Sequence, residues 1–246
     1  MSPDLPRSRR LEASPACSGV LPVLEWPCTM KATSVRRLVR PMTLEDVPQV
    51  EEIEREAFPT TWPPSAFQHE LRHNRIARYL VAVEEPEEAT DERPEPPPEP
   101  GLARLLGGMW RALRAQGEGR ERVVGYLGIW LPADEAHIIA VAVRNSHRRQ
   151  GIGELLLLAG LELARREGRA LATLECRVSN LPAQALYEKY GFKRVGLRPR
   201  YYSDNMEDAY VMALDGLDTP AVARRLEELR HLYLARWGDV QFRVGA

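Results

Sequence analysis

The segment 137–192 constrains the fold of this chain more than any other part. It opens with the apolar run His137–Val143, and a polar loop, two glycines and the leucine-rich segment 154–166 follow. A second apolar run, Leu171–Val178, precedes a final segment, residues 180–192. Short apolar runs bounded by turn residues indicate strands, and helical spacing indicates the helices between them. The predicted order is therefore strand, glycine turn, helix, strand, helix.

Gly151 and Gly153 stand where the first of these helices begins. Glycine lets the backbone approach a ligand closely, and the N–H groups of a first helical turn have no partners within the helix. Together with the helix dipole they favour an anion, most often a phosphate. Two common phosphate loops match poorly. The Gly-Lys-Ser/Thr of a P-loop is absent, and Leu156 stands where a dinucleotide fingerprint has its third glycine.

Three motifs carry a resemblance to a known family. The first is Arg/Gln-x-x-Gly-x-Gly, which occupies residues 148–153. The second is Asn-x-x-Ala-x-x-Leu-Tyr-Glu followed by Gly-Phe, in residues 180–192. The third is the ending Arg-Tyr-Tyr and Glu-Asp-Ala-Tyr-Val-Met, in residues 200–202 and 207–212. With these motifs the chain resembles the GNAT acetyltransferases, and among them the RimI-type ribosomal-protein-alanine N-acetyltransferases.

The resemblance covers residues 34–214, apart from an insert, and it implies the fold. It predicts an α/β (α+β) GNAT fold, in which a mixed central sheet of about six to seven strands is flanked by helices. In this family the fourth and fifth strands splay apart in a V, and acetyl-CoA sits there. Periodicity itself predicts strands such as 79–83 and 123–130. It also predicts a helix that starts at Thr43, with Asp46 as the acidic partner of a capping box.

The same resemblance implies which residues hold acetyl-CoA. The backbone of Val141, Ala142 and Val143 should run beside the pantetheine. Asn180 should bond the cofactor arm, and it has a competing role as a helix cap. The side chain of Glu154 should point away from the phosphates, because a carboxylate opposes them. The pyrophosphate should be held by the loop and the first helical turn, namely Arg148, Arg149, Gln150, Gly151, Ile152, Gly153 and Glu154. No metal is expected.

Direct attack of an amine on a thioester needs a base for the ammonium, a donor for the thioester oxygen and an acid for the leaving thiolate. Glu175 is the candidate base, on the strand face opposite to Leu174 and Cys176. A solvated strand carboxylate is the ordinary interpretation, and the family's matching Leu-Glu-x-Arg segment favours the base. Tyr187 is the candidate acid by the same resemblance, although its helical stripe equally predicts a core tyrosine. The oxyanion donor is expected to be a backbone N–H near Val143.

The resemblance also suggests an acceptor, the N-terminal α-amino group of a protein. The foremost case is the N-terminal alanine of a small-subunit ribosomal protein. An α-amino group has a pKa of about 7.7–8.0, against about 10.4 for lysine, so one carboxylate suffices as base. Tyr201, Tyr202 and Glu207 are the candidate acceptor-side residues. Alternatives are acetylation of other protein N-termini or lysines, and a non-catalytic acyl-CoA sensor, which would need neither Glu175 nor Tyr187.

Composition bounds the remaining expectations. The 246 residues have a net charge of −1, so no global field favours a nucleic acid partner. Cys17, Cys28 and Cys176 have no metal-ligand spacing, which indicates a reducing, cytoplasmic setting. No run approaches the roughly 20 apolar residues of a membrane span. The oligomeric state is left open.

The domain organisation follows from shifts in composition. The composition of residues 1–33, rich in Pro, Ser and Arg, predicts a disordered tail. Translation could start at Met1 or at Met30. Residues 84–120 form an insert that is acidic and proline-rich at first and then carries an amphipathic helix at 102–113. We expect that helix to dock on its own domain rather than on a partner or a membrane surface. Residues 215–246 form a C-terminal helical extension that begins with the cap-then-proline signal Asp-Thr-Pro.

Overall fold

The computed structural model describes most of the chain, and the described part belongs to one compact unit. The predicted tail at 1–33, the two candidate start sites and the insert helix at 102–113 lie outside the described residues. The described residues are 36–60, 62–63, 65–85, 121–238 and 240–243.

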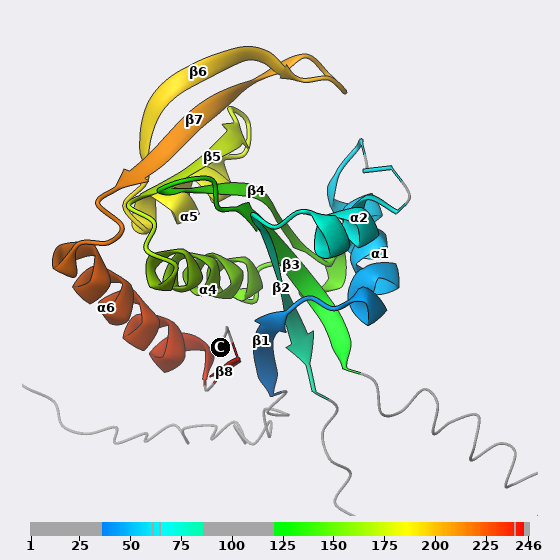
Figure 1. Ribbon diagram of the computed structural model, residues 1–246, viewed down its shortest axis with the longest axis horizontal. Coiled ribbons are helices and arrows are strands. Elements are labelled where there is room, and N and C mark those ends of the chain that lie inside the picture. Colours follow the sequence, from blue (N-terminus) through cyan, green and yellow to red (C-terminus); the bar gives the residue numbers. More distant parts are fainter. Residues whose placement is uncertain (1–35, 61, 64, 86–120, 239, 244–246) are drawn as a thin grey trace, which may run out of the picture. The chain divides into compact units, whose positions relative to one another are not determined.

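Strands in the described residues form one mixed sheet of eight, in the order β6-β7-β5-β4-β3-β2-β1-β8 (Figure 1). The strands are β1 (Arg37–Pro41), β2 (Ala77–Glu84), β3 (Arg122–Trp130), β4 (Glu135–Val143), β5 (Leu171–Arg177), β6 (Lys193–Tyr202), β7 (Glu207–Asp215) and β8 (Val240–Phe242). Among these described strands, the pairs β4–β5 and β1–β8 are parallel and the other neighbours are antiparallel. The sheet confirms the predicted mixed architecture and has one strand more than the upper expectation. The extra strand is β8, which comes from the C-terminal extension.

The predicted caps at Thr43, Asn180 and Thr219 are confirmed, and the described residues form five helices. They are α1 (Val47–Ala57), α2 (Ala66–His73), α4 (Ile152–Arg166), α5 (Leu181–Lys189) and α6 (Pro220–Trp237), with short 3-10 turns at η1 (Leu44–Asp46) and η2 (Asn145–His147). The backbone N–H of Thr43 donates to the Asp46 carboxylate at 2.8 Å. Asn180 accepts from the Ala183 N–H at 3.3 Å and so caps α5. Thr219 caps α6 in the same way.

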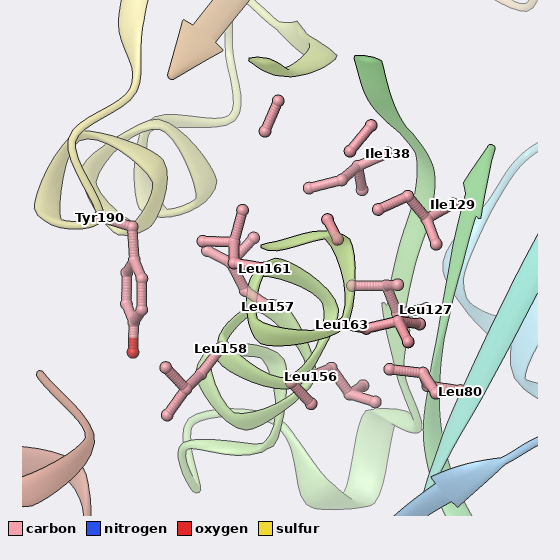
Figure 2. Close-up of a cluster of buried hydrophobic side chains, with 14 of the residues drawn as sticks. Leu80, Leu127, Ile129, Ile138, Leu156, Leu157, Leu158, Leu161, Leu163 and Tyr190 are labelled. Atoms are coloured by element: carbon pink, nitrogen blue, oxygen red, sulfur yellow. The ribbon is translucent and has the colours of Figure 1, made fainter. Parts of the chain in front are cut away.

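Hydrophobic cores fill both faces of the sheet. Helices α1 and α2 lie on one face, and α4 lies on the other (Figure 1). Four consecutive leucines of α4, residues 155–158, are fully buried against strand residues such as Leu127 and Ile129 (Figure 2). The second core packs Ile53 of α1 and Phe67 of α2 onto the opposite face. A helix buried on nearly all sides explains the near-continuous apolar run that the sequence shows here.

The parallel pair β4–β5 is short, and this creates the opening at the centre of the sheet. Pairing runs only from Glu135↔Leu171 to Ile138↔Leu174. Beyond that point β4 continues to Val143 but pairs only with β3, while β5 remains paired with β7. A bulge at Ile139 shifts the β3–β4 register at the same level. Bulges bend a strand and disturb its ladder. The two strands therefore splay apart toward their carboxyl ends, as the resemblance implied.

Candidate active site

The backbone of β4 supplies polar groups to the splayed opening. The N–H of Arg144 donates to the Val124 carbonyl at 2.9 Å, and the next pair along is Val143↔Gly125. Along an antiparallel pair of strands, the backbone N–H and C=O groups of successive residues point alternately toward the neighbouring strand and away from it. Val143 and Val141 therefore direct their N–H and C=O groups away from β3, toward the side that β5 has left. Ala142 lies between them and has a buried side chain.

The loop before α4 has the conformation expected of an anion site. Arg149 and Gly151 both have positive φ, 65° and 78°. A Cβ on Gly153 would meet only Val143, at an ordinary 3.7 Å, so packing within the protein does not require a glycine there. Arg148 and Arg149 are exposed, and in the part of the chain that the structure describes no carboxylate forms an ion pair with either. Arg148 Nε donates to the Val143 carbonyl at 3.4 Å, and two guanidinium groups without a carboxylate partner beside a helix N-terminus suit a phosphate group.

The remaining residues of this loop face the protein. Ile152 is 1% exposed and anchors the start of α4 in the core. Gln150 accepts from Arg37 through its side-chain oxygen at 2.6 Å. The carboxylate of Glu154 accepts from Lys189 and, at 3.2 Å, from the Tyr190 hydroxyl. It therefore turns toward α5 and away from the loop, as expected for a carboxylate next to a phosphate site.

Glu175 lies on the strand face opposite to the apolar core, and its side chain is only 7% exposed. Its two oxygens have different partners. His137 Nε2 lies 3.3 Å from Oε2, and Arg198 Nη1 lies 3.1 Å from Oε1. The hydrogen bond with His137 lowers the pKa of Glu175, the charges of His137 and Arg198 lower it further, and partial burial opposes them. The carboxylate is therefore ionised at neutral pH.

His137 connects Glu175 to a chain of hydrogen bonds that sequence reasoning missed. Its Nδ1 lies 2.8 Å from the Thr173 hydroxyl, and that hydroxyl donates to Glu135. A hydroxyl has one proton, so the Thr173 oxygen accepts from an Nδ1–H. The other ring nitrogen, Nε2, is the one that faces Glu175. The available signal was a histidine at the start of an apolar strand, but only the β4–β5 register His137↔Thr173 shows what it faces.

Tyr187 is half-buried on α5, where its ring packs against Phe192 at a centroid distance of 5.9 Å. Burial raises the pKa of Tyr187 well above its ordinary value, and nearby Cys176 and Tyr202 raise it further. No hydrogen bond to its hydroxyl is formed by the described residues. The phenol therefore stays protonated across the usual pH range and can still donate.

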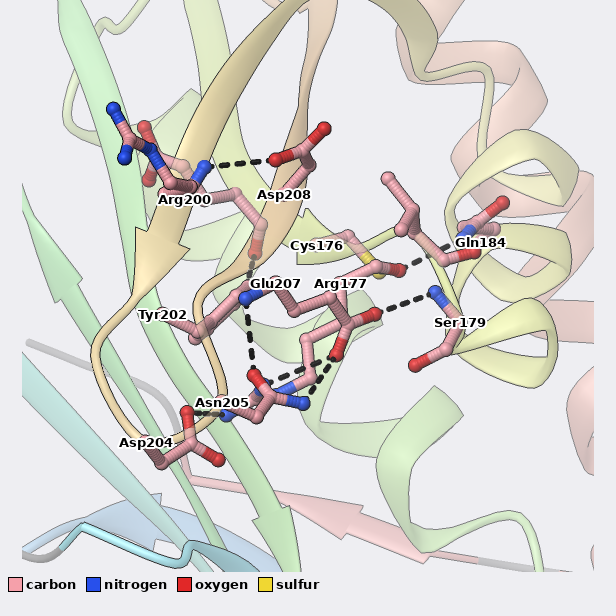
Figure 3. Close-up of polar contacts among 12 residues, drawn as sticks. Cys176, Arg177, Ser179, Gln184, Arg200, Tyr202, Asp204, Asn205, Glu207 and Asp208 are labelled. Carbon is pink, nitrogen blue, oxygen red and sulfur yellow. Dashed lines mark hydrogen bonds and ion pairs between the residues drawn. The ribbon is translucent and has the colours of Figure 1, made fainter.

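The predicted acceptor-side residues flank the β6–β7 hairpin turn, with Tyr201 and Tyr202 at the end of β6 and Glu207 at the start of β7. Figure 3 shows Tyr202 and Glu207 on the two strands. Glu207 accepts from the Ser179 N–H at 2.8 Å and from Arg177 at 3.1 Å. The hydrogen bonds from Ser179 lower the pKa of Glu207 to about 2. Arg177 stacks on the Tyr202 ring at 3.8 Å. These contacts tie the hairpin to the loop after β5, so that the Glu207 carboxylate is already engaged.

Tyr201 and Tyr202 differ in their surroundings. Tyr201 is 44% exposed, and Arg198 lies over its ring at 5.5 Å, so the Arg198 guanidinium touches both Tyr201 and Glu175. The Tyr202 hydroxyl donates to the Glu175 backbone carbonyl at 3.5 Å. Tyr202 thus supports the strand that carries Glu175, and Tyr201 forms part of the exposed rim beside it.

Comparisons with known proteins show the family to which the chain belongs. Residues 47–192 match the Acetyltransferase (GNAT) family. A Bacillus subtilis protein with the name "Putative [ribosomal protein bS18]-alanine N-acetyltransferase" is 35% identical over 174 residues, which are 71% of this chain and 92% of that protein. An N-alpha-acetyltransferase of Saccharolobus solfataricus is 45% identical over 80 residues, 32% of this chain and 47% of that protein. The Escherichia coli ribosomal-protein-S18-alanine N-acetyltransferase structure gives a TM-score of 0.53 at 24% identity, covering 73% of this chain and 94% of that chain.

The chain therefore belongs to the GNAT family of acetyltransferases and is an acetyl-CoA-dependent N-acetyltransferase. Within the family it is similar to the RimI-type enzymes, because the match to the Bacillus subtilis protein covers most of both chains. The E. coli structure supports the fold alone. No helix among the described residues is both long and apolar enough to cross a membrane.

Proposed function

We propose that this protein transfers the acetyl group of acetyl-CoA to the N-terminal α-amino group of a ribosomal protein, with an N-terminal alanine as the acceptor residue. The observation that carries the proposal is the ionised Glu175, which lies on β5 beside the splayed opening and is held by His137 at 3.3 Å. The name of the Bacillus subtilis relative supports the choice of acceptor. A ribosomal acceptor would place the reaction in the cytoplasm.

The backbone of the opening would hold the cofactor. Val141 and Val143 would pair with the pantetheine arm as a missing strand would, since their polar groups face the opening. The N–H of Val143 is the proposed oxyanion donor. The free N–H groups from Gly151 to Glu154, with Arg148 and Arg149, would hold the pyrophosphate. Asn180 already uses its side chain as a helix cap, so any contact with the cofactor arm would have to be compatible with that bond.

The proposed reaction has two proton transfers, one to a base and one from an acid. Glu175 accepts a proton from the acceptor ammonium, directly or through a water, and His137 orients its carboxylate and keeps it ionised. Tyr187 donates a proton to the leaving thiolate, because burial keeps its hydroxyl protonated. The ammonium must compete with Arg198 for Oε1 of Glu175. Arg198 is half-exposed and can move away without opening the core.

An acceptor panel tests the proposal. Thiol release from acetyl-CoA would be measured with a peptide carrying the N-terminal sequence of protein bS18, an N-terminally blocked lysine peptide and a polyamine. The product would be mapped by mass spectrometry. Release with the first peptide alone, and a mass gain of one acetyl on its N-terminus, is the expected result. Release only with the lysine peptide or the polyamine would overturn the acceptor and keep the enzyme class.

Acetylation of other protein N-termini is the second candidate. The observation that favours it is the match to an N-alpha-acetyltransferase at 45% identity over 80 residues. Peptides of equal length beginning with Ala, Ser and Met would separate the two. A preference for alanine in a ribosomal context supports the first proposal, and similar rates on all three support the second. Binding of acetyl-CoA without release from any acceptor would instead favour an acyl-CoA sensor.

A further inference from the structure

The C-terminal helix α6 ends against the loop proposed to hold the pyrophosphate. Gly151 has a φ of 78°, and a Cβ built on it would lie 2.7 Å from Cε2 and from Nε1 of Trp237, and 2.9 Å from Cδ2. Because three atoms of the ring system lie at this distance, the indole packs directly on the Gly151 backbone. A glycine is therefore required here by the backbone conformation and also by the indole beside it.

Trp237 is fixed by the chain on both sides of it. Before it, α6 buries Leu226, Leu229 and Tyr233 in the same core as α4. After it, Gly238 ends the helix with a φ of 84°, and β8 then pairs in parallel with β1. The indole thus stands between a packed helix and a paired strand. The backbone that carries the indole is therefore held in place on both sides.

The same loop is also held by β1. The Arg37 guanidinium donates to the Gln150 carbonyl at 3.1 Å and to its side-chain oxygen at 2.6 Å. Arg37 is the residue that pairs in register with Val240 of β8. Neighbouring loop residues, Gln150 and Gly151, are therefore held by Arg37 and by Trp237. The strand pair β1–β8 links these two supports.

Trp237 supports the loop by packing and not by a hydrogen bond. Its Nε1 is buried, and within the described part of the chain no acceptor lies in hydrogen-bond distance. The contact with Gly151 is therefore one of van der Waals surface. A phenyl ring can supply much of that surface, whereas a methyl group leaves space beneath the loop.

We propose that Trp237 is a positioning residue for acetyl-CoA, and that the C-terminal extension is a working part of the cofactor site. The inference rests on the proposed role of the loop in binding the pyrophosphate. A loop with two positive-φ residues must be ordered before its N–H groups can converge on a phosphate, and that ordering costs affinity unless it is already present. Trp237 and Arg37 provide the order in advance.

Calorimetry on the full-length protein tests the inference with CoA and, separately, with pantetheine, which has no pyrophosphate. Trp237→Ala is expected to raise the Kd for CoA about tenfold, the loss expected when one or two loop residues must be ordered on binding. The Kd for pantetheine should stay the same. Trp237→Phe should remain close to wild type. Leu232→Ala is the matched control, because Leu232 lies on the same helix and is 61% exposed.

Three results would overturn the inference. An unchanged Kd for CoA in Trp237→Ala would show that the loop does not need the indole. Equal weakening of CoA and pantetheine would show a general loss of structure. A Trp237→Phe variant as weak as Trp237→Ala would show that an aromatic ring packed at this position does not support the loop. If Trp237→Ala shows no cooperative melting transition, Trp237→Leu replaces it in the same comparison.

The test also separates this inference from the proposed function. It measures CoA binding without any acceptor, so a wrong acceptor leaves its outcome intact. A wild-type protein that binds pantetheine as tightly as CoA would overturn the assignment of the loop to pyrophosphate, and the inference with it. A wild-type protein that binds CoA tightly but acetylates no α-amine would overturn only the proposed function.

Discussion

Replacing Glu175 with glutamine removes the proposed base and preserves the shape of the side chain. The amide oxygen can still accept from Arg198 or His137, which lie 3.1 and 3.3 Å from the carboxylate oxygens. The substitution therefore changes the charge and the basicity and leaves the strand in place. A positioned general base contributes about 10²–10⁴-fold, so kcat/KM for the acceptor at pH 7 should fall by that factor.

The pH dependence makes this prediction sharper. An α-amino group with a pKa of about 8 is roughly 10% uncharged at pH 7 and roughly 90% uncharged at pH 9. An amine that arrives uncharged does not need Glu175 to deprotonate its ammonium form, although the base still takes the proton that the nitrogen loses on attack, so the deficit of Glu175→Gln should shrink about tenfold between these pH values. The wild-type enzyme gains less, because Glu175 is already ionised at both. Its pKa lies below the ordinary value.

The assay follows thiol release from acetyl-CoA under kcat/KM conditions, with calorimetry to show that the Kd for acetyl-CoA is unchanged. Glu188→Gln is the control, since Glu188 is about half-exposed and its carboxylate forms an ion pair with the exposed Arg194. A Glu175→Gln variant with wild-type activity at pH 7 would refute the role of the base. So would a deficit that stays the same from pH 7 to pH 9.

Three further substitutions test neighbouring parts of the site and the core. Tyr187→Phe should lower kcat about 10²-fold at an unchanged Kd for acetyl-CoA. In the wild-type enzyme, the rate should not fall as the pH is raised to 10, since burial raises the pKa of Tyr187. His137→Ala removes the main cause of the lowered pKa of Glu175, so this pKa should rise. On acidification the variant should therefore lose activity at a higher pH than the wild type does. A profile of kcat/KM against pH measures this shift. Tyr126→Phe deprives the buried Glu54 of its hydroxyl donor and should lower the free energy of unfolding in urea by about 1–3 kcal/mol.

Local signals in the sequence determined most of the elements and the faces of the candidate residues. The period of two along β5 placed Glu175 opposite to Leu174, and the structure has the same alternation of buried and half-buried positions. Caps at Thr43, Asn180 and Thr219 predicted the helix starts because the capping groups lie within three residues of the N–H groups they satisfy. The turn from residue 148 to 153 was likewise visible as a motif.

Pairing between distant segments could not be predicted from the sequence. The parallel register that sets His137 beside Glu175, and the hairpin that brings Arg198 to the same carboxylate, depend on how whole strands align. The sequence pattern does not predict which residues of two strands pair, because a strand has the same period of two in every register.

The C-terminal extension shows the same limit most clearly. Its helix was predicted from its cap and its apolar stripe, but β8 is only three residues long and has no strand pattern of its own. It is a strand because β1 presents a free edge with which it pairs. The sequence by itself determined the helix and the glycine turn, since both depend on neighbours in the chain. Only the tertiary structure decided that Trp237 lies against Gly151, because that contact depends on the packing of α6 and the pairing of β8 together.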